Sequence, residues 1–199
     1  MESLLAVVAA ESTQAIVVQP ASGGVHCAAL AAFERDGAGW RCVSGPVAAT
    51  VGRSGIVAGE PKREGDGHTP AGVHRLGTAF GYARSLPTRL DYRQTTADDW
   101  WIDAPSSPLY NTWVVGKPAV SAERMRRDDD QYSLGAVVEW NTLRRQPGRG
   151  SAIFLHVWSG PERPTEGCVA VAADQLRALL AWLDAERRPV LVIVDDPLR

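Results

Sequence analysis

The chain has few cysteines and histidines, no excess of charge of one sign and no long hydrophobic run. Its three cysteines are too few and too scattered for a disulfide framework, and no two have the spacing of a zinc knuckle or a redox motif. Four scattered histidines form no metal-binding motif, so we expect neither a metal nor another cofactor. A formal net charge of −2 offers no basic footprint for nucleic acid, which we exclude as a partner.

The only apolar run near the start, residues 4–10, is too short to span a bilayer and lacks the basic flank of a secretory signal. We therefore expect no membrane span, and the sequence as printed shows no signal peptide. A cytoplasmic protein, a mature or trimmed form and a misplaced start all remain open at this point.

What the chain does contain indicates a single globular domain over residues 1–199. With 45% hydrophobic and 22% charged residues, it can bury a sizeable core and lacks the composition of a disordered chain. Residues 1–50 hold short β-branched or aromatic segments separated by glycines, which predicts an N-terminal β-meander. Its expected strands are Gln14–Gln19, Val25–Glu34 and Trp40–Val43.

The rest of the chain predicts a mostly β fold with one amphipathic helix near the C-terminus. Leucines spaced at i, i+3, i+4 and i+7 predict that helix over Ala173–Ala185. Residues 84–133 are irregular and rich in proline and aromatic residues, which favours a lid or a substrate cleft. Further strands are expected at Val73–Phe80, Gly135–Asn141, Ala152–Trp158 and Val190–Val194, the second and third joined as a hairpin or close neighbours.

One segment, IFLHVWSGPERPTEGCVAV (residues 153–171), combines residues suited to covalent catalysis. A cysteine thiol is mostly protonated at neutral pH and needs a base beside it, which His156 can supply to Cys168. Gly167 allows a tight turn, after which the N–H groups of Gly167 and Cys168 can point at a developing oxyanion. The alternative is that Cys168 is a small buried hydrophobe. No group that orients His156 is identifiable, since a backbone carbonyl leaves no trace in a sequence.

The same segment resembles the signature of the YkuD-type L,D-transpeptidase family, in which a His precedes a Ser/Thr-x-Gly-Cys element. Upstream, GDGHTPAGVHRLG (residues 65–77) resembles the Gly-x-x-Thr-Pro-x-Gly element of that family. WIDAPSSPLYNTWV (residues 101–114) is similar to a segment found in one of its branches. Together these matches indicate a resemblance over about residues 51–195.

This resemblance implies a β-sandwich or barrel of the YkuD kind that acts on peptidoglycan stem peptides in the cell envelope. Cys168 would be the nucleophile that forms a thioester, His156 the general base, Thr165 the Ser/Thr position that contacts substrate, and Gly167 the turn residue beside the oxyanion. An amine of a second stem would then resolve the thioester and complete a cross-link. The resemblance also implies that carbapenem-type β-lactams are possible inhibitors.

The chain departs from the family pattern at two positions. The best-known members have a His directly before the Gly-Cys pair and an Arg or Asn shortly after it, where this chain has Glu166 and Ala170. The loop between His156 and Cys168 is also shorter than in many members, which implies a differently shaped donor pocket. We interpret the chain as a divergent branch of the family.

For other candidate residues, a structural role has to be weighed against a role in binding substrate. Glu166 can hold an imidazolium or an incoming amine, but a solvated loop carboxylate is the favoured interpretation. Tyr110 and Asn111 suit a substrate cleft or a loop anchor equally. Trp158 is expected on the same strand face as His156, where it can contact substrate.

Two further alternatives concern disulfide formation and the reaction itself. Cys27 and Cys42 lie on two strands that we pair as a hairpin, so a cross-strand disulfide is possible in an oxidising compartment. The same Cys and His site can serve a stem-peptide hydrolase, in which water replaces the amine. A binding module with an inert Cys168 is the alternative outside enzymes.

Overall fold

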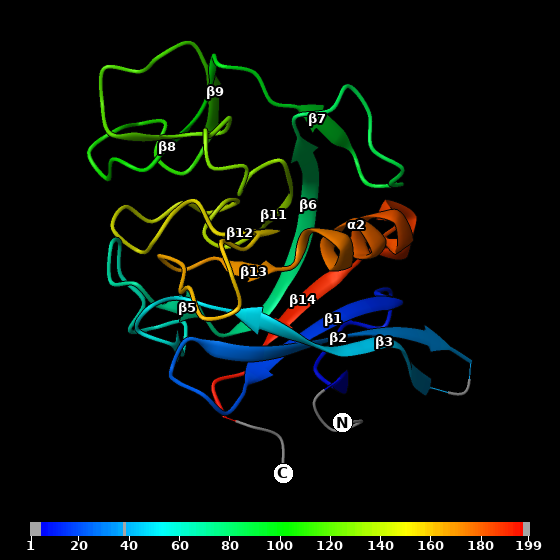
Figure 1. Ribbon diagram of the computed structural model, residues 1–199. Coiled ribbons are helices and arrows are strands. Elements are labelled where there is room, and N and C mark those ends of the chain that lie inside the picture. Colours follow the sequence, from blue (N-terminus) through cyan, green and yellow to red (C-terminus); the bar gives the residue numbers. More distant parts are fainter. Residues whose placement is uncertain (1–4, 38, 197–199) are drawn as a thin grey trace.

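A closed β-sheet forms the body of the protein in the computed structural model, which describes residues 5–37 and 39–196 (Figure 1). The sheet order is β11-β12-β13-β3-β2-β1-β14-β6-β7, and an additional pairing of β11 with β6 closes the ring. The strands of this sheet are β1 Gln14–Pro20, β2 Cys27–Asp36, β3 Gly39–Thr50, β6 Gly72–Gly81, β7 Tyr92–Gln94, β11 Leu134–Val138, β12 Phe154–Val157, β13 Val169–Val171 and β14 Val190–Ile193. The predicted mostly β, barrel-like fold class is confirmed.

The first three strands are consecutive antiparallel neighbours and continue directly into the rest of the sheet. β1 pairs in parallel with β14, and β3 pairs antiparallel with β13 through Ala170 and Thr50. A two-stranded pair, β4 Ile56–Val57 with β5 Thr69–Pro70, lies beside this part of the ring. The N-terminal strands therefore support the strand that follows Cys168.

A disulfide between Cys27 and Cys42 is not formed. Cys27 lies opposite Thr50 at one end of the β2–β3 ladder, whereas Cys42 lies opposite Phe33. Six residues of extended strand separate the two positions, about 20 Å at the rise of a β-strand. Both thiols are free, so the disulfide that the sequence left open does not form, because a hairpin brings together only residues in register.

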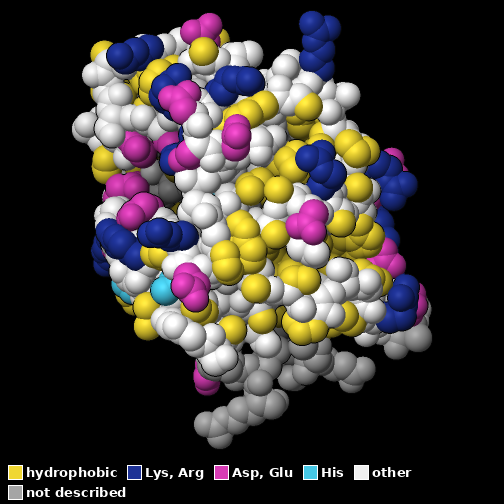
Figure 2. Space-filling model, in the orientation of Figure 1, with side chains coloured by type: hydrophobic (Ala, Val, Ile, Leu, Met, Phe, Trp, Pro, Cys, Tyr) yellow, Lys and Arg dark blue, Asp and Glu magenta, His cyan; other side chains and the backbone are white. Residues whose placement is uncertain are grey.

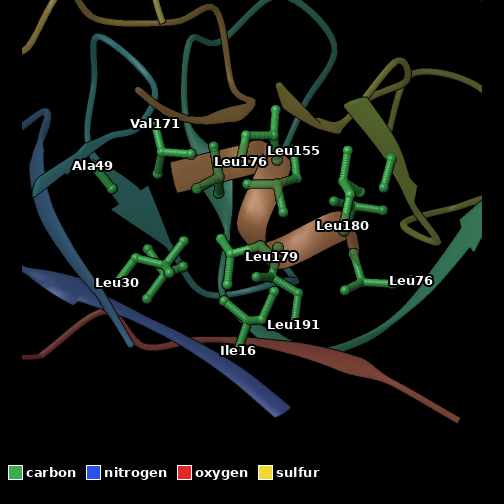
Figure 3. Packing of buried hydrophobic residues seen from close by; sticks show 14 of the residues in the cluster. Ile16, Leu30, Ala49, Leu76, Leu155, Val171, Leu176, Leu179, Leu180 and Leu191 are labelled. Carbon is green, nitrogen blue, oxygen red and sulfur yellow. The ribbon is translucent and has the colours of Figure 1, made fainter. Parts of the chain in front are cut away.

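The inside of the ring is filled by aliphatic side chains, with helix α2 (Ala173–Trp182) packed among them. Leu176, Leu179 and Leu180 of α2 are buried against side chains from β1, β2, β6 and β14, as Figure 3 shows. The predicted helix runs three residues too far, because Leu183 is already extended with φ −66° and ψ 140°. A 3₁₀ turn at Ala185–Arg187 follows it.

A second layer covers the outer face of the ring near β6, β11 and β12. It is built from the stretch predicted to be irregular, which contains a small three-stranded sheet with the order β10-β8-β9. Its strands are β8 Asp99–Ile102, β9 Trp113–Val115 and β10 Ala122–Arg124. We call residues 99–132 the lid. Charged side chains of both signs gather on the side of the molecule where the lid lies, as Figure 2 shows.

An aromatic cluster joins the lid to the ring. It contains Phe80, Val137 and Phe154 from the ring, Trp101, Met125 and Tyr132 from the lid, and Cys168. Phe154 stacks edge-on against Trp101 and Tyr132, with ring centroids 5.1 and 5.5 Å apart. Such contacts fix the lid on the outer face.

Within the described residues, no helix has the length and apolarity needed to cross a bilayer.

Candidate active site

Cys168 and His156 lie on one face of two neighbouring parallel strands. β12 and β13 pair with Leu155 opposite Val169 and His156 opposite Ala170. Because side chains alternate along a strand, Phe154 and His156 share the outer face with Cys168 and Ala170. The two side chains that the sequence singled out both line a cleft of about 390 Å³ between the ring and the lid.

The Cys168 sulfur is held by two backbone groups at the start of β12. The N–H of Phe154 donates to Sγ at 3.3 Å, and the thiol donates to the carbonyl of Ala152 at 3.3 Å. Cys168 is 7% exposed. Burial raises the pKa of the thiol to about 12, and the nearby Glu123 carboxylate acts in the same direction. In the resting protein the sulfur is therefore a protonated thiol.

A backbone carbonyl orients His156, the group that the sequence could not reveal. Nδ1 lies 2.8 Å from the carbonyl oxygen of Val157. A carbonyl can only accept, so Nδ1 carries the proton and the neutral ring has its basic nitrogen at Nε2. Burial lowers the pKa of His156 to about 4. The pair therefore rests as neutral thiol and neutral imidazole.

The loop that carries Cys168 is fixed by two threonine hydroxyls. Thr165 Oγ1 donates to the carbonyl of Cys168 at 2.7 Å and accepts from the N–H of Gly167 at 3.1 Å. Thr69 Oγ1 donates to the same carbonyl at 3.2 Å. Thr165, expected to contact substrate, thus holds the loop. The Gly167 N–H, expected to face an oxyanion, is occupied by Thr165, which leaves the Cys168 N–H as the candidate donor.

Gly167 is required by the backbone itself. Its φ is +143°, a region that residues with a side chain rarely adopt. A Cβ at this position would lie 2.9 Å from the carbonyl oxygen of His68 and 3.3 Å from Cδ1 of Ile153. The loop can therefore approach residues 68 and 153 only with glycine at this position.

Three residues from the lid side of the cleft were missed by the sequence analysis. Tyr132 stacks edge-on against His156 with ring centroids 5.2 Å apart, and its hydroxyl donates to Glu123 Oε1 at 2.6 Å. The hydroxyl also lies close enough to Cys168 to lower the pKa of the thiol slightly. Arg127 donates to Glu123 at 3.2 Å. No local motif marks these residues, since the lid alone brings them to the cleft.

The remaining predicted contact residues have different surroundings. Glu166 lines the cleft but is 80% exposed on its side chain and pairs with Arg53 at 3.1 Å, in agreement with a solvated carboxylate. Trp158 is not among the residues that line the cleft. Tyr110 and Asn111 are 2% exposed behind it, so neither is placed to contact substrate in this conformation. Tyr110 donates to Glu64, which does line the cleft.

Among residues 5–37 and 39–196, no group of three or more His, Cys, Asp or Glu side chains is arranged to hold a metal ion.

The cleft between the ring and the lid is lined by more carboxylates than cations. Lys62 pairs with Asp66 at 2.7 Å, and Arg127 pairs with Asp129 at 2.5 Å. The carboxylates are Glu64, Asp103, Glu123 and Glu166, and the cations are Lys62 and Arg127.

Comparisons with known proteins agree with the resemblance found in the sequence. No curated protein matches the chain. Among solved structures, the crystal structure of the helical cell shape determining protein Pgp2 from Campylobacter jejuni is similar, with a TM-score of 0.50 and 14% identity. The match covers 94% of this chain and 49% of that one, so this chain spans about half the length of that protein.

The family model of the L,D-transpeptidase catalytic domain, YkuD, matches residues 27–192. That range runs from β2 to β14 and includes both His156 and Cys168. At 14% identity the solved structure shows a shared fold, whereas the family match extends over most of the sequence. The chain belongs to the family of L,D-transpeptidase catalytic domains.

Proposed function

We propose that this protein is a cysteine acyltransferase that forms a thioester between Cys168 and a peptidoglycan stem peptide and passes the acyl group to an amine of a second stem. One observation carries the proposal: Cys168 and His156 face the same cleft from adjacent parallel strands, with His156 Nδ1 anchored on the Val157 carbonyl. Membership of the family makes peptidoglycan the expected substrate and the cell envelope the expected location.

The neutral pair supports general-base activation of the thiol. Nε2 of His156 removes the thiol proton while the sulfur attacks the scissile carbonyl carbon, since a free thiolate is disfavoured in this buried site. The C–N bond then breaks, and the imidazolium returns the proton to the leaving amine. The result is a thioester on Cys168, a released peptide fragment and a neutral His156.

The second half of the reaction uses the same groups. The nitrogen of the acceptor amine attacks the thioester carbonyl, His156 takes a proton from it, and the C–S bond breaks as the sulfur leaves. Protonation of the sulfur by His156 restores the thiol. The carboxylates around the cleft favour binding of the acceptor as an ammonium ion, which loses one proton to solvent before its nitrogen attacks; this supports transfer to an amine.

Product analysis with defined stem peptides tests the proposal. Wild-type protein is expected to give cross-linked peptide and a Cys168 acyl adduct that mass spectrometry detects, whereas Cys168→Ala gives neither. Cys42→Ala is the matched control, because Cys42 is exposed and lies on a different part of the ring.

The same experiment separates the alternatives. A free carboxylate product without cross-linked peptide would show the hydrolase. Binding of stem peptide without any adduct, by stem peptide or by a carbapenem, would show a muropeptide-binding module and contradict the proposed chemistry.

A further inference from the structure

Asn111 lies behind the cleft, where its side-chain amide forms four hydrogen bonds. Nδ2 donates to the carbonyls of Trp140 and Asn141 at 3.0 and 2.8 Å. Oδ1 accepts from Trp101 Nε1 at 2.8 Å and from the backbone N–H of Ala152 at 3.1 Å. These use both donors and both acceptor positions of the amide. The side chain is thus fixed completely within the protein.

The bond to Ala152 leads directly to the nucleophile. Ala152 lines the cleft, and its carbonyl accepts the Cys168 thiol. Its φ is +53°, a left-handed conformation that is uncommon for a residue with a side chain and persists only when its surroundings enforce it. The contact that Asn111 makes with the Ala152 N–H is one such constraint.

A second path runs from Asn111 to the same strand entrance. Trp140 and Asn141, whose carbonyls accept from Asn111, in turn bind the backbone just before Ala152. The Trp140 Nε1 donates to the carbonyl of Arg149, and the Asn141 side-chain amide donates to the carbonyl of Gly150, both at 3.0 Å. Asn111 therefore fixes Ala152 directly through Oδ1. Through Nδ2 it fixes Arg149 and Gly150 indirectly.

We propose that Asn111 is a positioning residue that acts on Cys168 through Ala152, setting the carbonyl that orients the thiol, rather than a contact for substrate. The inference rests on the proposed reaction of Cys168 and deepens it. Asn111 belongs to the lid, so the lid contributes to the geometry of the nucleophile as well as to the wall of the cleft.

Asn111→Gly is the main test, because glycine accepts the φ of +57° at this position while the amide is removed. We expect kcat to fall about 10- to 100-fold, as for a misplaced reacting group, with KM within about twofold. Asn141→Gly is the comparison variant: Asn141 has φ +54° and bonds to Gln146 and Gly150, so its removal breaks only the indirect path and keeps the direct bond between Asn111 and the Ala152 N–H. Its kcat is expected to stay within about threefold of wild type.

A spectroscopic readout tests the inference without relying on turnover. The Raman S–H stretching band of Cys168, obtained as the difference between wild type and Cys168→Ala, reports the hydrogen bond to Ala152. It is expected to move to higher frequency in Asn111→Gly and to stay unchanged in Asn141→Gly. Should the wild type form no product, this band alone decides the inference, so the two proposals fail separately.

Asn111→Asp provides a second variant, in which one carboxyl oxygen still accepts from the Ala152 N–H and the other, protonated in this buried site, donates to only one of the two carbonyls. We expect an unchanged S–H band and a smaller loss of kcat than in Asn111→Gly. A raised KM with unchanged kcat in Asn111→Gly would instead identify a substrate contact. Equal effects of Asn111→Gly and Asn141→Gly, or a band that moves in folded Asn111→Asp, would also overturn the proposal.

Discussion

The inside of the ring and the cluster beneath the lid are both buried, but they are built from different chemistry. The ring interior consists of aliphatic side chains and one helix face, with leucines such as Leu155, Leu176 and Leu180 fully buried. The lid cluster is aromatic and includes Cys168, with His156 and Glu123 at its border. A core that excludes polar groups stabilises the fold, whereas burial in the second cluster keeps the candidate pair, Cys168 and His156, neutral.

This comparison predicts that substitutions beneath the lid change the reaction more than the stability. His156→Gln removes the proposed base but keeps a polar side chain of similar size, so the acylation rate of Cys168 is expected to fall about 10²- to 10⁴-fold. Single-turnover acylation by a stem peptide measures this rate, and thermal unfolding checks that the variant is folded. A folded variant with near wild-type acylation would remove His156 from the reaction.

The opposite pattern is expected inside the ring. Leu180→Ala leaves a cavity among tightly packed side chains, and we expect the free energy of unfolding to fall by about 2–5 kcal/mol. Urea denaturation measures the loss. Turnover per folded molecule should remain close to wild type at low temperature. A loss of turnover as large as that of His156→Gln would show that the two regions are not separate in function.

Acid should affect the cluster beneath the lid through His156. Its pKa in the folded protein is about 4, below the ordinary 6.5, so the unfolded chain binds the proton more readily. This contribution to stability is complete above pH 6.5 and is lost as the pH falls through about 4. The difference between these two pKa values corresponds to about 3 kcal/mol in the free energy of unfolding.

Urea denaturation at pH 7 and at pH 4 measures this contribution in wild type and His156→Gln. Other groups also titrate in this range, including Asp129, whose pKa Arg127 lowers to about 2. The difference between the two proteins isolates the part due to His156. An equal loss of stability in both would contradict the buried neutral imidazole.

The smallest effect is expected at the rim of the cleft. Glu166→Gln removes the exposed pair with Arg53, so the free energy of unfolding should change by less than about 1 kcal/mol. Turnover should stay within about twofold of wild type. A tenfold or greater rise in KM would show that Glu166 binds substrate despite its exposure, and would extend the functional region to the rim.

Several elements followed from local patterns alone. The leucine spacing located α2, and alternating or continuous apolar segments located β1, β6 and β14 within a few residues. The His and Gly-Cys segment identified the candidate pair because nucleophile and base lie within one short stretch. The resemblance to the family rested on that segment and its upstream partners, and the family match confirms it.

Other features depended on residues far apart in the chain. The lid strands are short and irregular in pattern, so their pairing could not be inferred, and Tyr132 and Glu123 reach the cleft only because those strands fold over β12. The separation of Cys27 from Cys42 depended on the register of β2 and β3. The carbonyl of Val157 orients His156, and the hydroxyls of Thr69 and Thr165 hold the Cys168 loop, only because the folded backbone places them beside those groups.

The sequence by itself determined which side chains are candidates for the chemistry and which family the chain resembles, because both depend on residue type at short spacing. Only the tertiary structure decided how those side chains are protonated and held. Burial, which brings the pKa of His156 to about 4 and that of Cys168 to about 12, is a property of the assembled lid and ring. Desolvation depends on every neighbour that excludes water, and local sequence does not specify those neighbours.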